Sequence, residues 1–463
     1  MESLIILVFV MGYLAITLEH NLKLDKLIPA LMMMAICWAL IALGIDAFGN
    51  WFDSSAHGLV EGFSGLGHEE KMHWVEETLL HHLGKTAEIL VFLLGAMTIV
   101  EIIDYFDGFS TIKSYVNFKS KKKLLWMFSI LAFVLSAIID NLTATIVLIS
   151  ILQKIVKERD DRIWFAGLII IAANAGGAFS PIGDVTTTML WIGDKVSTSM
   201  LFMYLFIPSV LCMVVPSTIA SFLPAFQGEI EIEGNDNKPT SPHSGTMLYL
   251  GLGAIVFVPI FKTVTHLPPY VGMMMSLAVV AIFAELYSRT KITLTYFDPS
   301  ESEAHGHHSP VHHSLSKIEM PSILFFLGIL MAVAALESLG ILFNFADNLK
   351  ENIPLLGSEL AGAKVSDLVV IFLGVGSAVI DNVPLVAASL GMFAEPLDDP
   401  LWHFIAFSAG TGGSMLIIGS AAGVVAMGME KIDFFWYLKK ISWLALAGFL
   451  VGSISFVLLR MIL

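Results

Sequence analysis

Two copies of one hexapeptide, Ser-Ala-(Ile or Val)-Ile-Asp-Asn, end in Asp140-Asn141 and in Asp381-Asn382. Both lie inside apolar stretches, and an ionised aspartate at the middle of a bilayer costs about 2.5–3.5 kcal/mol. This cost indicates a functional group, because serine or asparagine would cap a helix without the charge. Each Asp-Asn pair offers one charged and one neutral oxygen ligand, which suits a hard cation. Since an aspartate holds either a proton or a small cation, mutual exclusion is a simple physical basis for exchange.

Two more apolar segments are interrupted by polar residues. The first interruption runs from Asn174 to Asp184, reads Asn-Ala-Gly-Gly-Ala-Phe-Ser-Pro-Ile-Gly-Asp, and is followed by Thr186. Its counterpart in the second half of the chain contains Ser414 but no acid. Non-helical backbone at membrane depth is tolerated where protein or a water-filled cavity satisfies its polar groups. We therefore expect both interruptions to face a site, with Asp184 serving a task of its own.

The composition places the chain among membrane proteins. It is 56% hydrophobic and 14% charged, and its mean hydropathy is +0.80, values typical of polytopic membrane proteins. Many of the 40 acids fall in the three segments 46–78, 226–246 and 295–319. The net charge of −15 is thus a property of loops and indicates no nucleic-acid partner. The partners predicted are monovalent cations, protons and the lipid bilayer.

The apolar pattern predicts an all-α polytopic fold. Runs long enough to cross a bilayer occur near residues 3–18, 27–45, 79–104, 200–225, 247–262, 270–287, 321–339 and 434–459. Four further segments are interrupted and form two helical hairpins, 124–157 and 367–394, and two broken helices, 163–192 and 401–428. The start of the chain, Met1-Glu2-Ser3, lacks the positive n-region of a signal peptide, so the first run is expected to be a retained helix.

Basic residues predict how the first hairpin is inserted. Lysines at 119 and 121–123 precede it, and Lys154, Lys157, Arg159 and Arg162 follow it. Basic flanks favour the cytoplasmic side, so both ends lie inside and the hairpin is re-entrant, with Asp140-Asn141 at its tip. Asn141 or Thr143 can cap its second helix.

Each half then has five crossings, one hairpin and one broken helix. An odd number of crossings inverts the second half, so we predict two inverted repeats, 1–225 and 247–463, joined by a 226–246 linker. The segment 46–78 is expected outside as a loop.

Several residues have competing interpretations. Asn141 and Asn382 are also suited to helix capping alone, and Ser136 and Ser377 to hydrogen bonding with the preceding turn. Possible accessory residues, beside Ser136, are Glu88, Glu337, His81 and His82, and the two histidines are candidates for a pH sensor. The histidine-rich segment 305–313 is interpreted as a solvated loop. Cys37 and Cys212 are expected to be inert thiols.

An enzyme is not expected. No His-Glu-x-x-His sequence and no Gly-x-x-x-x-Gly-Lys phosphate loop occurs in the chain. We expect no cofactor.

The motifs resemble those of the NhaD-type sodium/proton antiporters, in the wider ion transporter superfamily. The resemblance rests on four motifs that span both halves: Ser-Ala-Ile-Ile-Asp140-Asn141-Leu-Thr, the run from Asn174 to Thr186, Ser-Ala-Val-Ile-Asp381-Asn382, and Gly-Gly-Ser414. Related dicarboxylate carriers place Ser-Asn-Thr at the equivalent hairpin tips. Aspartate in place of that serine would repel a dianion and fits a cation as cargo.

The resemblance implies exchange of Na⁺ or Li⁺ for H⁺ across a bacterial inner membrane. It also implies a scaffold domain, a mobile transport domain holding the hairpins, and a homodimer. An anion or arsenite permease on the same fold is the alternative. The predicted ion- and proton-binding residues are Asp140, Asn141, Thr143, Asn174, Asp184, Thr186, Ser377, Asp381, Asn382 and Ser414, with Na⁺ at Asp140, Asn141, Asp381 and Asn382.

Overall fold

The structure is a computed structural model. It describes residues 1–17, 22–53, 58–113, 118–230, 243–292, 309–318, 320–342, 344–345, 365–379 and 382–463. Asp381 lies outside these residues. In the described part of the chain, seven helices are long and apolar enough to cross a membrane, and the one small sheet pairs β1 (Phe52–Asp53) with β2 (Gly58–Leu59). The predicted all-α membrane fold is confirmed.

The first half contains the helices α1 Glu2–Thr17, α3 Leu27–Leu43, α4 His68–Tyr105, α5 Ser110–Lys113, α6 Lys121–Ile139, α7 Asn141–Ile155, α8 Arg159–Ala178, α9 Val185–Ile192 and α10 Thr198–Ala220. The second half contains α11 Ser244–Thr265, α12 Pro269–Ile292, α13 Pro310–Lys317, α14 Met320–Ser338, α16 Asp367–Gly376, α17 Asn382–Met392, α18 Pro400–Gly412, α19 Ala421–Glu430, α20 Phe434–Lys440 and α21 Ser442–Arg460. Short 3-10 turns occur at Ile45–Ala47, Phe63–Gly65 and Pro224–Phe226.

Three predicted elements differ from the structure. α4 begins at His68, so the end of the predicted 46–78 loop is helical, and Glu70 in its first turn accepts a 3.0 Å hydrogen bond from the backbone N–H of Gly67. The final predicted run is divided into α20 and α21 at Ile441. In the histidine-rich segment, His312 and His313 belong to helix α13, which packs on α4, so this end of the segment is no solvated loop. His305, His307 and His308 lie outside the described residues.

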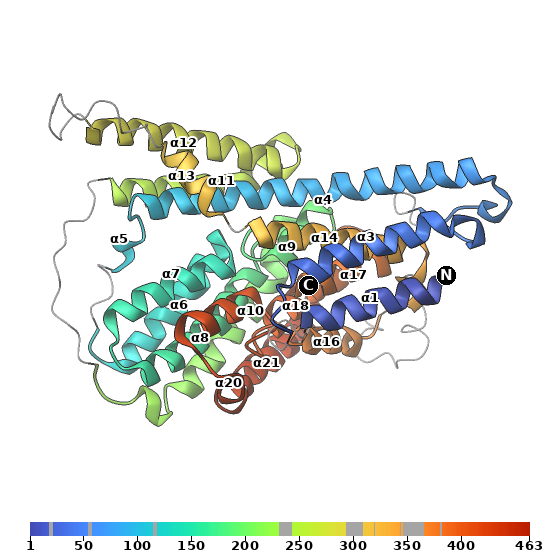
Figure 1. Cartoon of the computed structure of the whole chain (residues 1–463). Helices are drawn as coiled ribbons and strands as arrows, with labels where there is room; N and C mark the ends of the chain where they lie inside the picture. Colours follow the sequence, from blue (N-terminus) through green and yellow to red (C-terminus); the bar gives the residue numbers. More distant parts are fainter. Residues whose placement is uncertain are drawn as a thin grey trace.

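The helices pack in two groups (Figure 1). In the first group, α4 extends along the molecule and packs against α12, α14 and α11, while α14 also packs on α3 and α3 on α1. The second group contains the hairpin α6–α7, the broken helices α8–α9 and α18–α19, and α10, α16, α17 and α21. The groups meet mainly where α14 packs on α17, α4 on α9 and α11 on α6.

Corresponding contacts hold the hairpin against the broken helix in each half. A Cβ atom at Gly176 would lie 2.1 Å from the carbonyl oxygen of Phe133, and one at Gly412 would lie 2.0 Å from that of Gly374. Only glycine permits such close backbone packing. These contacts support the alignment of the two halves, and the inverted orientation of the repeats remains a prediction.

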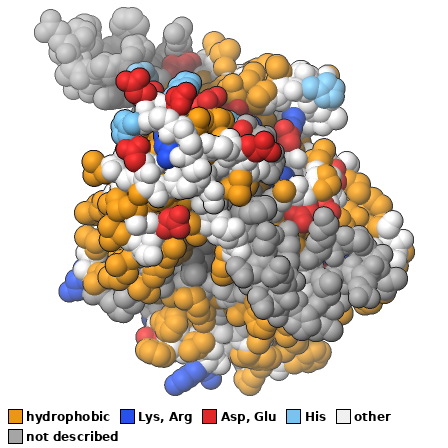
Figure 2. Space-filling model, turned by 90° about the vertical axis from the view of Figure 1, so that its right-hand side faces the viewer, with side chains coloured by type: hydrophobic (Ala, Val, Ile, Leu, Met, Phe, Trp, Pro, Cys, Tyr) orange, Lys and Arg blue, Asp and Glu red, His pale blue; other side chains and the backbone are white. Residues whose placement is uncertain are grey.

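Ion pairs connect the ends of the helices. Lys121, at the start of α6, donates a 2.7 Å hydrogen bond to Asp161 in the first turn of α8, so both ends of the first hairpin lie at one end of the molecule. Arg460 of α21 forms a bidentate pair with the buried Asp367 of α16, at 2.7 and 2.6 Å. Figure 2 shows the end of the molecule at which α4 begins, where acidic and histidine side chains gather and apolar side chains cover the flanks.

Candidate ion-binding site

The Asp184 carboxylate is the acceptor on which both hairpins converge. Asn141, the first residue of α7, donates from Nδ2 to Asp184 Oδ2 at 2.7 Å. Asn382, the first residue of α17, donates from Nδ2 to the same oxygen at 3.3 Å. Thr186 donates to Asp184 Oδ1 through its backbone N–H at 2.9 Å and through its hydroxyl at 2.8 Å. Asp184 is 2% exposed, so the carboxylate is buried and strongly hydrogen-bonded.

Asp140 forms the one-residue turn between α6 and α7. Its φ of 74° and ψ of 157° lie in a region that is essentially reserved for glycine and costs on the order of 1–3 kcal/mol for other residues. Its carboxylate caps α7, accepting hydrogen bonds from the backbone N–H and the hydroxyl of Thr143, both at 2.8 Å. An aspartate kept at a glycine-like position supports a function for its carboxylate.

A polar chain extends the site into the second half of the protein. Asn174 accepts a 2.9 Å hydrogen bond from Asn141 and donates a 3.0 Å hydrogen bond to the hydroxyl of Ser420. Ser420 also caps α19, accepting from the backbone N–H of Gly423. All of the interrupted segments therefore contribute to one hydrogen-bonded network, because the end of each helix brings uncapped polar groups to the middle of the molecule.

These side chains surround a central cavity of about 70 Å³, which Asp140, Asn141, Asp184 and Asn382 line together. Since one water needs at least about 10–15 Å³ of such space, the central cavity is large enough for a small cation with a few waters. Lys26, just before α3, lies at its edge, with Nζ 4.5 Å from the centre of the Phe325 ring. Carboxylate and amide oxygens around a small cavity suit a hard cation.

Other predicted residues serve the packing around the site. Ser136 donates to the carbonyl oxygen of Ala173 at 2.6 Å, and Ser377 donates to that of Ala409 at 3.1 Å. Each serine thus joins a hairpin to its broken helix. Ser414 donates to Thr411 within the second interruption. These buried serines are held by backbone carbonyls and, among the described residues, do not line the central cavity.

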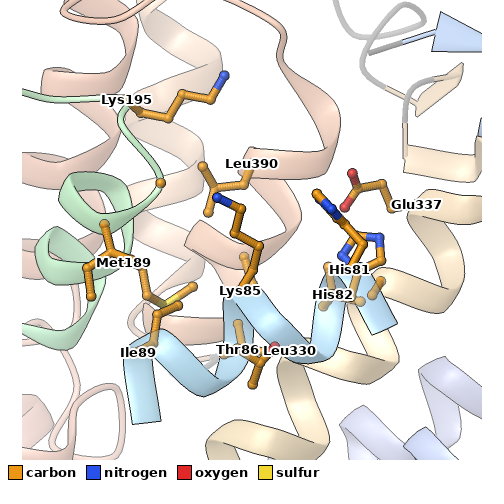
Figure 3. Close-up of a pocket in the computed structure, with 15 residues that line it drawn as sticks. His81, His82, Lys85, Thr86, Ile89, Met189, Lys195, Leu330, Glu337 and Leu390 are labelled. Atoms are coloured by element: carbon orange, nitrogen blue, oxygen red, sulfur yellow. The ribbon is translucent and has the colours of Figure 1, made fainter. Parts of the chain in front are cut away.

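A second cavity has a volume of about 380 Å³. Four of the possible accessory residues lie outside the hairpins, and three of these line this cavity. His81, His82 and Glu337 line this histidine cavity, together with Lys85 and Lys195. In Figure 3, Glu337 lies next to the two histidines, and Lys195 lies farther away, on the opposite side of the cavity. Burial lowers the pKa of Lys195, which follows α9, while the carboxylates of Glu395 and Glu337 oppose this change. Glu88 lies on α4 and is not among the residues that line the described cavities.

A third cavity, of about 300 Å³, lies at the other end of α4. Glu101, Asp104 and Asp107 line this acidic cavity, with Lys154 and Lys317. It shares Met97, Leu142 and Thr143 with the central cavity, so the two adjoin. In the part of the chain that the structure describes, no group of three or more His, Cys, Asp or Glu side chains is arranged to hold a resident metal ion.

The predicted site residues leave out two that the structure places at the site, Ser420 and Lys26. Ser420 aligns with Asp184, because Ile418-Gly419-Ser420 corresponds to Ile182-Gly183-Asp184, and this signal was available. Lys26 had no such signal, since a lysine before an apolar run is ordinarily interfacial. Its place beside the central cavity depends on how α3 packs against α14.

The chain matches proteins of known families. A family model described as "Citrate transporter" matches residues 7–402. "Sodium/proton antiporter 2" of Arabidopsis thaliana is 38% identical over 97% of this chain and 98% of its own length. "Na(+)/H(+) antiporter NhaD" of Vibrio cholerae is 31% identical over 98% of this chain and 91% of its own length.

A solved structure supports the fold. The YdaH transporter of Alcanivorax borkumensis superposes with a TM-score of 0.56 and 12% identity, over 93% of this chain and 98% of that chain. The matched relatives come from a plant and from bacteria, and their full-length similarity covers every interrupted segment of the site. The chain therefore belongs to the NhaD-type sodium/proton antiporters, within the family described as citrate transporters.

Proposed function

We propose that this protein is a secondary active transporter that exchanges Na⁺ or Li⁺ for H⁺ by alternating access. The observation that carries the proposal is the convergence of Asn141 and Asn382, from the two hairpins, on the Asp184 carboxylate. Ion and proton compete for the intramembrane aspartates, because a protonated carboxyl offers a cation no charge. The relatives named as sodium/proton antiporters support the same exchange.

The charge of the site favours a cation over an anion. Asp140 and Asp184 line one small cavity, and two carboxylates repel a polyanion such as citrate. Their oxygens, with the amide oxygens of Asn141 and Asn382, suit Na⁺. The anion or arsenite permease is therefore not favoured, and the proposed reaction moves ions without covalent chemistry.

The two packing groups suggest which part moves. We assign the group around α4, α3 and α14 to the scaffold, and the group containing both hairpins and both broken helices to the mobile transport domain. The groups meet over a restricted set of helix contacts, which suits sliding or rocking of one body against the other. In this proposal the halves 1–225 and 247–463 are inverted repeats, with 226–246 as the linker.

For location and assembly, we propose a homodimer in the bacterial cytoplasmic membrane. The relatives from Vibrio and Halomonas support the bacterial assignment, whereas the Arabidopsis relatives extend the family to a plant. Light scattering after size-exclusion chromatography in detergent measures the number of chains per particle, and a single chain would contradict the dimer.

The test of function is collapse of a proton gradient in everted membrane vesicles from cells that lack other sodium/proton antiporters. Addition of sodium or lithium chloride is expected to restore the fluorescence of a ΔpH-quenched dye, because cation uptake drives protons out of the vesicle. Choline citrate serves as the control that supplies the anion without the cation. Restoration by choline citrate and none by the sodium or lithium salts would support the citrate permease instead.

A second test concerns the first hairpin. Cysteines at Ser120 and Arg159, in a protein whose two native cysteines are replaced, are expected to react with a membrane-impermeant maleimide from the cytoplasmic side. A cysteine at Asp398, in the loop between α17 and α18, is expected to react from the opposite side. The reason is that basic residues bracket the first hairpin and Lys121 pairs with Asp161 at its base. Reaction of positions 120 and 159 from opposite sides would exclude a re-entrant hairpin.

A further inference from the structure

One face of α4 lines all three cavities in succession. His82, Thr86 and Ile89 line the histidine cavity, Leu93 and Met97 the central cavity, and residues 100, 101 and 104 the acidic cavity. These positions recur at intervals of three and four residues and so share one helix face. From residue 82 to 104 the helix rises about 33 Å, which matches the roughly 30 Å hydrocarbon core of a bilayer.

Along α4, the central cavity adjoins the acidic cavity but not the histidine cavity. The central and acidic cavities share three lining residues, Met97, Leu142 and Thr143. The histidine cavity, in contrast, shares no described residue with the central cavity. The ion-binding side chains thus lie next to the acidic cavity and are separated from the histidine cavity by intervening residues.

The separation is one helical turn thick on each of the four helices that line both cavities. On α4, Ile89 lines the histidine cavity and Leu93 the central cavity. On α9, the corresponding residues are Met189 and Val185. Both pairs are spaced four residues apart, about 6 Å along the helix. All four side chains are apolar, and Met189 is 1% exposed.

The other two helices repeat this spacing. On α14, Leu330 lines the histidine cavity and Phe326 the central cavity, and on α17 the corresponding residues are Ala387 and Val383. We call these four pairs on α4, α9, α14 and α17 the apolar layer. Half of the layer belongs to the proposed scaffold (α4 and α14), and half belongs to the proposed transport domain (α9 and α17).

We propose that the apolar layer is the closed gate of this state, and that the histidine cavity is the other half of the ion path. The inference rests on the proposed function and adds the gate and the direction in which the site is open. A layer of apolar side chains blocks an ion because the ion would have to shed its water without new ligands. If α9 and α17 moved along α4 and α14 by about one turn, the pairs of the transport domain would no longer lie level with the pairs of the scaffold. This movement would open the layer.

Cysteine accessibility tests the gate without any transport assay. In a background in which the buried Cys37 and Cys212 are replaced by alanine, Lys85→Cys reports on the histidine cavity and Ser150→Cys on the acidic cavity. Ser322→Cys reports on the central cavity, because Ser322 lines it and is not part of the apolar layer. A small charged thiol reagent is applied from either face of oriented vesicles. We expect Lys85→Cys and Ser150→Cys to react from opposite faces. We expect Ser322→Cys to react at least about tenfold faster from the Ser150 face.

Opening the layer should remove this asymmetry. Adding Leu330→Ser is expected to let Ser322→Cys react from both faces at similar rates, and to allow Na⁺ uptake without an opposing proton gradient. The matched control is Leu324→Ser on the same helix, a 38% exposed residue, which should retain one-sided reaction.

Equal reaction of Ser322→Cys from both faces in the parent protein would overturn the gate. So would one-sided reaction that persists with Leu330→Ser. Because labelling needs no ion exchange, these results are independent of the vesicle assay that tests the proposed function.

Discussion

Asp184→Asn is expected to lower the rate of Na⁺/H⁺ exchange by at least about 100-fold. Contacts to a charged group contribute about 1.5–3 kcal/mol each, and 1.4 kcal/mol is a factor of ten. Asparagine keeps the size of the side chain and one oxygen that accepts from Asn141 or Asn382, so the site can still assemble. It loses the charge that holds the cation. The measurement is the rate of dye recovery in everted vesicles across a range of Na⁺ concentrations.

The sequence alone predicts a milder effect, because Asp184 has no acidic counterpart in the second half. The geometry reverses this expectation, since the amides of both hairpins converge on its carboxylate. Asp194→Asn is the matched control, because Asp194 is a largely exposed surface acid paired with Lys262, and it should retain the parent rate. Exchange by Asp184→Asn within a factor of two of the parent, at equal expression, would contradict a central role for this carboxylate.

Lowering the pH is expected to raise the apparent KM for Na⁺ about tenfold per unit once the pH is below the pKa of the competing carboxyls. Protons and Na⁺ exclude one another at a shared carboxylate, and each unit raises the proton concentration tenfold. Above that pKa the carboxylates are ionised and the KM should become independent of pH. Saturating Na⁺ should restore the maximal rate at the lower pH. Na⁺ saturation curves at several pH values measure both quantities.

A separate pH sensor would behave differently. His81 and His82 line the histidine cavity with Lys85, Lys195 and Glu337, so protonation there would change the charge at one end of α4. In that case the maximal rate would fall at low pH whatever the Na⁺ concentration, and it would recover in a His81→Ala, His82→Ala double variant. This outcome would exclude simple competition.

Much of the local structure follows from residue patterns. The Asp-Asn tips and the Gly-rich interruptions mark where the apolar helices break, and the structure has helix ends at Ile139, Ala178 and Gly412. The extra turns of α4 and the helix α13 were missed. Both are polar segments whose stability comes from packing, since α13 lies against α4, and packing is invisible to a count of apolar residues.

In the site, contacts between residues close in the chain could be predicted from the sequence, and contacts between distant residues could not. Capping of α7 by Asp140 and hydrogen bonding of Thr186 to Asp184 join residues two or three apart, and such contacts can be inferred from motifs. The role of Ser136 and Ser377 as ties between hairpin and broken helix required the positions of carbonyl groups in another helix. Burial and periodicity do not specify which distant backbone group a serine reaches.

The sequence by itself determined the class of protein, the family, the two repeated tips and the residue types of the site. Those properties depend on composition and on spacing within single segments. Only the tertiary structure decided that Asp184 is the common acceptor, because Asn382 lies 198 residues away in the chain. It also decided which residues separate the central cavity from the histidine cavity, since the apolar layer combines side chains from four helices. The residue pattern along one helix predicts which of its faces is apolar. Which helices pack against that face depends on the tertiary structure.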